Sequence, residues 1–340
     1  TGPNPSVGAV IVKNNNVISF GSTSKSGRPH AESIALKKLS NKIKKNSTIY
    51  ISLEPCAHYG KTPPCVNKII DSKIRKVVYS SNDVDLRTSG KSFKILKSKK
   101  ILVKKNLLKN SSKLIYKNYF YSKINNKPYV YGKLAISKDS YLKDKKNFYI
   151  TNKLSLETSH ILRSTVNCIL TTSKTINDDN PKLNCRLKGL KKYTPKRIIL
   201  DNKLNTKINS FIIKTANKSN TIIFYNEASN SKILSFRKKG INLINSKIDN
   251  KGRFDFKILL KKLYKLNCRN LLVEGGDKLT NYLLRNKTFN RFYLYESNKK
   301  LSKKTEYLNF NSLNLLKQKY KKKINLKLDL GKNKITLYKN

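Results

Sequence analysis

The chain has 340 residues, which is long for one hydrophobic core and predicts about two domains. It contains no run near the roughly 18 apolar residues of a membrane-spanning helix. Five cysteines, an odd number with no secretion signal ahead of them, argue against a disulfide-bonded scaffold and favour a reducing, cytoplasmic setting. Because the sequence contains no Met, we expect a segment ahead of Thr1 to be missing.

The net charge is extreme, because 74 Lys and Arg stand against 19 Asp and Glu, which gives +55. Such a surplus is one mark of a nucleic-acid-binding protein. Here the lysines are spread along the whole chain together with many Asn and Ile, and no basic block with interleaved aromatic residues stands apart. We therefore favour compositional drift toward AT-rich codons as the cause, although the positive field would still attract an anionic substrate.

The first third of the sequence alternates strand and helix patterns. Apolar runs on either side of three asparagines predict a hairpin. His30 precedes residues with helical apolar spacing, so His30 and Glu32 are placed in the first turn of a helix. A buried strand then delivers Pro55 and Cys56 at its end, and Cys65 starts a second helix. The two helix starts should face the same edge of one sheet. The predicted strands cover 7–12, 17–20, 49–53 and 77–79, and the second helix covers 66–70.

A helix is predicted over 106–121, and Asn125 to Pro128 form a break. We place the domain boundary there, with domains over 1–125 and 126–340. A second alternation of strands and helices follows, which implies a largely parallel sheet with covering helices. The predicted strands cover 129–136, 166–171, 197–201, 221–225, 241–244 and 270–274, and the helices cover 154–163 and 279–285.

His30, Cys56 and Cys65 are suitable zinc ligands, and Glu32 is a carboxylate beside them. Catalytic zinc takes three protein ligands and keeps a fourth position for water, whose pKa it lowers. Glu32 can carry the proton from that water to a leaving amine. Taken singly, each residue fits a bland interpretation: buried cysteines, a core histidine and a surface glutamate. Together, in the order His-x-Glu…Pro-Cys…Cys, they are typical of zinc nucleobase deaminases.

Eight residues separate Cys56 from Cys65, whereas cytidine and tRNA adenosine deaminases mostly hold these cysteines two residues apart. The longer segment includes His-Tyr-Gly-Lys-Thr-Pro-Pro-Cys over 58–65, and Thr-Gly-Pro-Asn-Pro-Ser-Val-Gly occupies 1–8. In these features the chain resembles the bifunctional riboflavin-biosynthesis deaminase/reductase family. The resemblance implies an α/β chain, with a cytidine-deaminase-like three-layer domain followed by a dihydrofolate-reductase-like α/β domain. It also implies Zn²⁺ and NADPH as cofactors, a further helix ahead of the 1–8 loop, zinc on His30, Cys56 and Cys65, and Glu32 as catalytic acid and base.

Softer motifs extend the resemblance into the second half. A Gly275-Gly276 turn before a helix is a candidate anion site, although an ordinary tight turn is the default interpretation. The order Thr175, Asp179, Pro181, Leu183, Arg186 matches a family pattern. The resemblance implies cofactor contacts from Ala135, Tyr149, Thr175, Asp179, Asn202 and Gly276, and substrate contacts from Asn147, Arg163, Leu183, Arg186 and Glu274. Arg163 and Arg186 are assigned to the ribose 5-phosphate, because arginine suits bidentate phosphate binding. Tyr149, Asn147, Asn202 and Ala135 stand where the family often has Trp, Ser, Ser and Gly.

The implied reactions are two steps of riboflavin biosynthesis. The first deaminates 2,5-diamino-6-(5-phosphoribosylamino)pyrimidin-4-one, and the second reduces the ribosyl group with NADPH to give 5-amino-6-(5-phosphoribitylamino)uracil. The expected partner is this small phosphoribosyl pyrimidine, with no nucleic acid or membrane, in a homo-oligomer. An RNA or tRNA deaminase is the first alternative, favoured by charge and opposed by the long cysteine spacing and the second domain. A non-enzymatic basic binding protein and a deaminase with an inactive reductase half remain the others.

Overall fold

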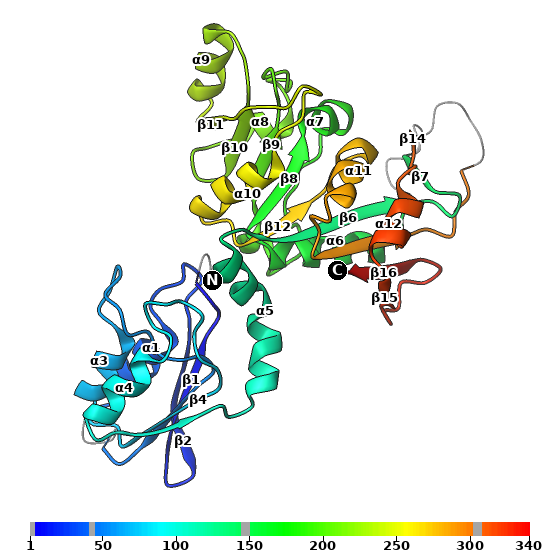
Figure 1. The fold of residues 1–340 in the computed structure, drawn as a ribbon. Helices are drawn as coiled ribbons and strands as arrows, with labels where there is room; N and C mark the ends of the chain where they lie inside the picture. The colour runs from blue at the N-terminus through cyan, green and yellow to red at the C-terminus, as the bar shows by residue number, and fades with distance from the viewer. Residues whose placement is uncertain (1–3, 41–44, 144–149, 302–307) are drawn as a thin grey trace. The chain divides into compact units, whose positions relative to one another are not determined.

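The computed structural model describes residues 4–40, 45–143, 150–301 and 308–340. The chain divides into two compact units, Thr1–Lys127 and Pro128–Asn340 (Figure 1). The division follows the end of helix α5 (Lys109–Asn125), where Asn126 takes a left-handed conformation with φ of 51°. Asparagine tolerates this conformation, and the following Pro128 disfavours a helical residue before it, so the helix stops there. No helix among the described residues is long and apolar enough to cross a membrane.

The described part of the first unit holds a five-stranded sheet in the order β2-β1-β3-β4-β5. β1 and β2 form the predicted antiparallel hairpin, and Asn14 and Asn15 adopt the positive φ values that its turn requires. The remaining neighbours of β3 and β4 are parallel. The strands are β1 (Gly8–Lys13), β2 (Asn16–Ser22), β3 (Thr48–Ile51), β4 (Lys76–Tyr79) and β5 (Leu102–Lys105).

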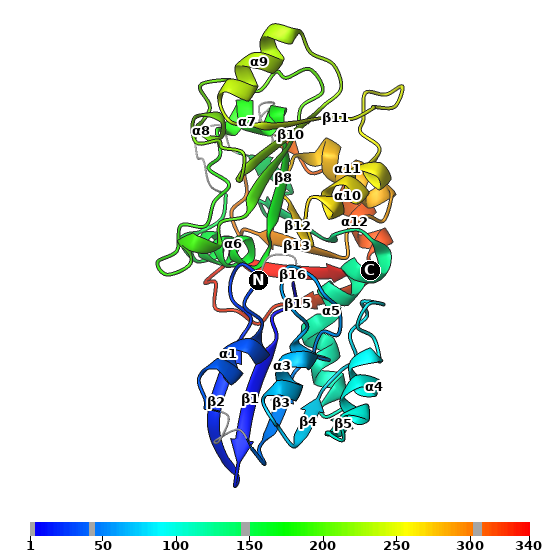
Figure 2. The ribbon, with the colours of Figure 1, turned by 90° about the vertical axis from the view of Figure 1, so that its left-hand side faces the viewer.

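Helices cover both faces of this sheet, which confirms the predicted three-layer arrangement (Figures 1 and 2). On one face lie α1 (Ala31–Lys37), α3 (Cys65–Asp71) and α4 (Lys91–Ser98), and α5 lies on the other. The core under the first face joins Ile11 and Ile49 of the sheet to Ala35, Val66 and Leu96 of the three helices. α4 and β5 were not among the predicted elements, because both are short, lysine-rich segments of eight and four residues.

The second unit contains a nine-stranded sheet in the order β11-β10-β9-β8-β12-β6-β13-β16-β15. The strands from β11 to β13 are parallel, which confirms the prediction of a largely parallel sheet, and β16 and β15 add an antiparallel edge. The strands are β6 (Tyr129–Ile136), β8 (Cys168–Thr172), β9 (Lys196–Leu200), β10 (Thr221–Tyr225), β11 (Asn242–Asn245), β12 (Asn270–Val273), β13 (Arg291–Glu296), β15 (Lys322–Asn325) and β16 (Lys334–Lys339). A separate pair joins β7 (Tyr141–Lys143) to β14 (Leu308–Asn309).

Helices lie on both faces of the second sheet (Figure 2). Leucines of α10, α11 and α12 pack on one face, against Leu170 of β8 and Ile198 of β9. The helices are α6 (Lys153–Thr165), α7 (Ser173–Asp179), α8 (Phe211–Lys214), α9 (Asn230–Lys238), α10 (Phe256–Lys265), α11 (Asp277–Arg285) and α12 (Leu313–Lys319), with a 3₁₀ turn over Lys191–Tyr193. Because β6, β8, β9 and β12 are parallel, their carboxyl ends meet at one edge, which is where open α/β sheets bind ligands.

Gly21 of β2 sets how closely α1 approaches the sheet. A Cβ at this position would meet the carbonyl oxygen of Ala31 and lie 2.8 Å from the amide nitrogen of Ala35, and both are backbone atoms that have little freedom to move. We predict that Gly21→Ala lowers the unfolding free energy of the first unit by about 1–3 kcal/mol. Urea denaturation followed by circular dichroism measures this. Gly8→Ala is the matched control, because its nearest new contact is 3.9 Å away, and it should change stability by less than about 0.5 kcal/mol. Equal effects of the two substitutions would contradict the prediction.

Candidate active sites

The first site is a cluster of His30, Cys56 and Cys65, whose donor atoms all lie within 4.8 Å of one another. His30 is the residue that precedes α1, Cys65 is the first residue of α3, and Cys56 follows β3. The His30 Nδ1 atom is 3.6 Å from the Cys56 Sγ and 3.3 Å from the Cys65 Sγ. Two sulfurs and one imidazole nitrogen are the donor set that zinc prefers, so these residues fit a Zn²⁺ ion.

The cluster also favours negative charge on sulfur. A hydrogen bond from Cys65 and the nearby His30 lower the pKa of the Cys56 thiol to about 4, against the opposing effect of burial. The same contact with Cys56, together with burial, raises the pKa of Cys65, and the hydrogen bond with Cys56 raises the pKa of His30. One thiolate is therefore stabilised before any cation is considered, and a divalent ion would favour the second.

Glu32 lies in the first turn of α1 and is only 3% exposed. Burial raises the pKa of its carboxyl above the usual value, so the group takes up a proton more readily than an exposed glutamate does. A raised carboxyl pKa of this kind suits general acid and base chemistry.

Other side chains organise the surroundings of the cluster. The Asn4 amide nitrogen lies 3.5 Å from the His30 Nε2 and donates to the Gly27 carbonyl at 2.8 Å. His58 stands outside the cluster, with its Nδ1 2.9 Å from the Thr88 Oγ1. Glu54 accepts hydrogen bonds from the amides of Asp83 and Gly90, both at 3.1 Å, and so holds the loop that follows β4.

The second unit contains a cavity of about 760 Å³, which we call the substrate cavity because the predicted substrate residues Arg163, Leu183 and Arg186 line it. Five of the predicted contact residues line it, from three separate segments of the chain: Ala135, Arg163, Asp179, Leu183 and Arg186. Its lining residues are Lys133, Ala135, Leu142, Ile150, Thr151, Leu156, Ser159, His160, Arg163, Asp179, Asn180, Pro181, Lys182, Leu183 and Arg186. Asn147 and Tyr149 lie outside the described residues, so their predicted contacts stay predictions.

Glu274 joins this cavity through an ion pair with Arg163. The guanidinium donates from Nε to Oε1 at 2.8 Å and from Nη2 to Oε2 at 2.7 Å, with both side chains largely buried. Burial alone would raise the pKa of Glu274, but the Arg163 charge outweighs it and the net shift is downward. Arg186 differs, because its Nη1 donates to the neutral Asn184 Oδ1 at 3.0 Å. Of the two arginines, Arg163 is neutralised by a carboxylate and Arg186 is not, so Arg186 is the better candidate to bind an anion.

Lys133 is a cavity residue that the sequence analysis did not select. It lies in β6, and its ammonium group is 4.9 Å from the centre of the Tyr295 ring. Burial lowers the pKa of Lys133, and the negative charge of Glu274 opposes this shift. The sequence does carry a signal for Lys133, because it interrupts a mostly apolar, mostly buried strand. Burying a charge costs free energy unless it is paired, so a lysine at such a position is a candidate functional residue. Its pKa makes proton release easier than for a surface lysine.

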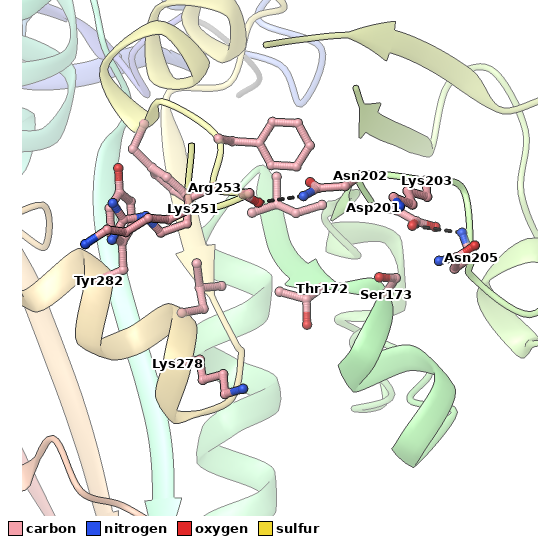
Figure 3. A pocket seen from close by; sticks show the side chains of 15 residues that line it. Thr172, Ser173, Asp201, Asn202, Lys203, Asn205, Lys251, Arg253, Lys278 and Tyr282 are labelled. Carbon is pink, nitrogen blue, oxygen red and sulfur yellow. Dashed lines mark hydrogen bonds between the residues drawn. The ribbon is translucent and has the colours of Figure 1, made fainter. Parts of the chain in front are cut away.

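A second cavity of about 590 Å³ lies at the ends of β8 and β9 and beside the start of α11 (Figure 3). We call it the dinucleotide cavity, because the predicted cofactor residue Asn202 lines it. Of the predicted cofactor residues it includes Asn202, whose amide donates to the Gly252 carbonyl at 2.5 Å. Gly276 is exposed at the residue preceding α11, with nothing within 4 Å of a Cβ built there. Thr175 lines neither cavity, and its hydroxyl is 3.1 Å from that of Thr172 at the start of α7.

We predict that Cys65→Ser reduces the zinc content of the purified protein from about one ion per chain to well below that, because a hydroxyl is a poor replacement for a thiolate ligand. Metal analysis by mass spectrometry measures this. Cys185→Ser is the matched control, since Cys185 is also buried but lies outside the cluster, and it should retain zinc. Undiminished zinc in the Cys65 variant would remove this residue from the ligand set.

Two family models match the chain. The cytidine and deoxycytidylate deaminase zinc-binding region matches residues 1–81, and the RibD C-terminal domain matches residues 128–302. Among solved structures, Acinetobacter baumannii RibD superposes with a TM-score of 0.86 over 100% of this chain and 93% of that one, at 24% identity, which speaks to the fold. The Thermotoga maritima diaminohydroxyphosphoribosylaminopyrimidine deaminase/5-amino-6-(5-phosphoribosylamino)uracil reductase gives a TM-score of 0.81 at 27% identity, over 99% of this chain and 93% of that one.

Curated relatives agree in sequence over most of their length. The riboflavin biosynthesis protein RibD of Aquifex aeolicus is 33% identical over 297 residues, which cover 87% of this chain and 81% of that protein. The RibD protein of Actinobacillus pleuropneumoniae is 32% identical over 87% of this chain and 78% of its own. At this identity over both halves, the protein belongs to the RibD family and is a bifunctional deaminase and reductase of riboflavin biosynthesis, with Zn²⁺ and NADPH as its cofactors.

Proposed function

We propose that residues 1–125 deaminate 2,5-diamino-6-(5-phosphoribosylamino)pyrimidin-4-one and that residues 126–340 reduce the product with NADPH to 5-amino-6-(5-phosphoribitylamino)uracil. The observation that carries this proposal is the convergence of the His30, Cys56 and Cys65 donor atoms beside the buried Glu32. The two activities named for the Thermotoga maritima protein support the substrate assignment.

In the deamination step, the role of His30, Cys56 and Cys65 is to hold the metal, which when bound lowers the pKa of water and makes it a nucleophile. Glu32 would take a proton from the attacking water as the new carbon–oxygen bond forms at the ring carbon bearing the amine. Glu32 then delivers the proton to the amino nitrogen as the carbon–nitrogen bond breaks, and ammonia leaves. The burial of Glu32, which raises the pKa of its carboxyl, favours this two-way transfer.

In the reduction step, bound NADPH supplies a hydride, and the protein supplies position and a proton. We assign Arg186 to the 5-phosphate of the substrate, since a neutral side chain is its only hydrogen-bond partner among the described residues. As the hydride adds to the ribosyl C1′ and the bond from C1′ to the ring oxygen breaks, that oxygen needs a proton. Lys133 is the donor we propose, because it lines the same cavity and burial has lowered the pKa of its ammonium. Arg163 and Glu274 then position the substrate as a pair rather than as separate ligands.

The finer statements about setting and partners belong to the same proposal. We place the enzyme in the cytoplasm, because Cys56 and Cys65 must stay reduced to bind a metal, and all five cysteines are free. We propose a homo-oligomer, which the exposed apolar side chains of Leu114 and Ile115 on α5 support. A nucleic-acid substrate is not favoured, since the relatives that match both halves of the chain are riboflavin biosynthesis proteins.

A coupled assay with the diaminopyrimidine phosphate, zinc and NADPH tests the proposal. The wild-type protein should release ammonia and then oxidise NADPH, whereas Glu32→Gln should lower the rate of ammonia release by about 10²- to 10⁴-fold, because a carboxamide cannot carry the proton. The variant should keep its zinc and should still reduce deaminated substrate supplied to it. Ammonia release without NADPH oxidation by the wild type would favour an inactive reductase half, and RNA deamination would favour the nucleic-acid alternative.

Arg186→Gln should lower kcat/KM for the reductase step by about 10- to 100-fold, chiefly by raising KM, because it removes one charge-assisted contact with the 5-phosphate. Steady-state NADPH oxidation with deaminated substrate measures this. Lys188→Gln removes the same charge from an exposed side chain two positions away, outside the substrate cavity, and should leave both constants unchanged. If both variants behaved alike, the phosphate would not be bound by Arg186.

A further inference from the structure

The two cavities of the second unit lie at the same edge of its sheet but have no lining residue in common. The substrate cavity takes Lys133 and Ala135 from β6, and the dinucleotide cavity takes Thr172 and Leu200 from the ends of β8 and β9. In the strand order β9-β8-β12-β6, β12 lies between them, and the Gly275-Gly276 turn follows its end. If the nicotinamide end of the cofactor lay in the substrate cavity, its adenosine end would fall in the cavity beside β9.

Asp201 is the one acidic side chain that lines the dinucleotide cavity. Enzymes selective for NADH use a carboxylate near a strand end to bind the adenosine ribose 2′-hydroxyl, whereas a cation there accommodates the 2′-phosphate of NADPH. Both oxygens of the Asp201 carboxylate already accept hydrogen bonds from the turn that follows β9. Its Oδ1 accepts from the Asn205 amide at 2.9 Å, and its Oδ2 accepts from the Thr206 amide at 2.8 Å and from the Thr206 hydroxyl at 2.6 Å.

Cations dominate the remaining charge of this cavity. Its lining includes Lys203, Lys251, Arg253 and Lys278, and Figure 3 shows Lys251 and Arg253 together beside Tyr282. The side chain of Lys251 makes no hydrogen bond or ion pair within the part of the chain that the structure describes. A phosphate monoester brings a charge of about −1.5 to −2 at neutral pH, which such a lining would balance.

Several contacts fix the loop that carries Lys251 and Arg253. Ile248 bridges Phe254 across the loop, and Gly252 at its turn has φ of 70°, a value that suits glycine. The Arg253 guanidinium lies 4.8 Å from the centre of the Tyr282 ring and pairs with Asp249 at 2.7 Å. Unlike the buried pair of Arg163, this pair is exposed to water on both sides, so it is weak and a phosphate can compete with it. The loop is thus tied to α11 on one side and, through the Asn202 contact with Gly252, to β9 on the other. The backbone that carries both side chains is therefore ordered before an anion binds, which lowers the entropy cost of binding.

We infer that Lys251 and Arg253 bind the adenosine 2′-phosphate of NADPH and thereby select it over NADH. The inference rests on the reductase function and adds which side chains read the cofactor. In a chain with a net charge of +55, the general field attracts either dinucleotide, so discrimination between them needs a local contact of this kind.

Isothermal titration of the zinc-loaded, full-length protein tests the inference without turnover. The probes are 2′,5′-ADP and 5′-AMP, which differ only in the 2′-phosphate, followed by NADP⁺ and NAD⁺. The double variant Lys251→Gln/Arg253→Gln should bind 2′,5′-ADP and NADP⁺ about 10- to 100-fold more weakly, which corresponds to the loss of one or two charge-assisted contacts. Its affinity for 5′-AMP and NAD⁺ should stay within about twofold, since charge-assisted contacts with the 2′-phosphate are absent there.

The matched control is Lys257→Gln/Lys261→Gln, which removes two charges from exposed positions of α10 outside the cavity. It should leave the preference for 2′,5′-ADP over 5′-AMP unchanged, and circular dichroism should show both variants folded. An equal loss in the two double variants would assign the preference to the overall field and overturn the inference. An unchanged preference in the Lys251 and Arg253 variant would also overturn it, while the reductase function would stand. A wild type that binds neither dinucleotide would overturn both.

Discussion

Parallel pairing of strands is the constraint on which the rest of this structure depends. In the first unit, β3 and β4 run side by side in the same direction, so Cys56 and the loop containing Asp83 leave the sheet at one edge. In the second unit, β6, β8, β9 and β12 share a direction, and both cavities open where they end. The chain can therefore vary its loops while the backbone hydrogen bonds of the sheet keep the distances between them.

Strong local patterns in the sequence were sufficient for much of this arrangement. β6 and β10 have the predicted bounds, because continuous apolar runs of that length fit buried parallel strands. Cys65 lies at the start of α3, as local spacing predicts. His30 was predicted in the first turn of its helix and lies one residue ahead of it, whereas Glu32 is in that turn. β15 was not foreseen, since its sequence Lys-Lys-Ile-Asn is exposed throughout and carries no alternation for a pattern to detect.

The site residues were harder to foresee where the decisive contact is distant in sequence. Arg163 and Glu274 were each singled out, but as separate substrate ligands, and their mutual ion pair spans 111 positions. Among 74 Lys and Arg, no local feature marks which cation is neutralised. Because acidic residues are few, a buried cation can have only neutral partners. Arg197 is buried and donates to Thr215, Asn220 and Thr221, and burial lowers its pKa to about 10.

The pairing of Arg163 with Glu274 has a consequence for how this enzyme can evolve. Loss of either partner leaves the other charge buried, at a cost of about 3–5 kcal/mol, a large share of the stability of an ordinary domain. Loss of Glu274 would also leave Lys133 beside Arg163, two cations that each destabilise the charged form of the other. Single substitutions at these positions are therefore deleterious in either order, so an exchange of the pair requires a double replacement or a prior gain of stability elsewhere. The buried pair of the reductase cavity therefore resists stepwise substitution, whereas the exposed Arg186 can be replaced one residue at a time at little cost in stability.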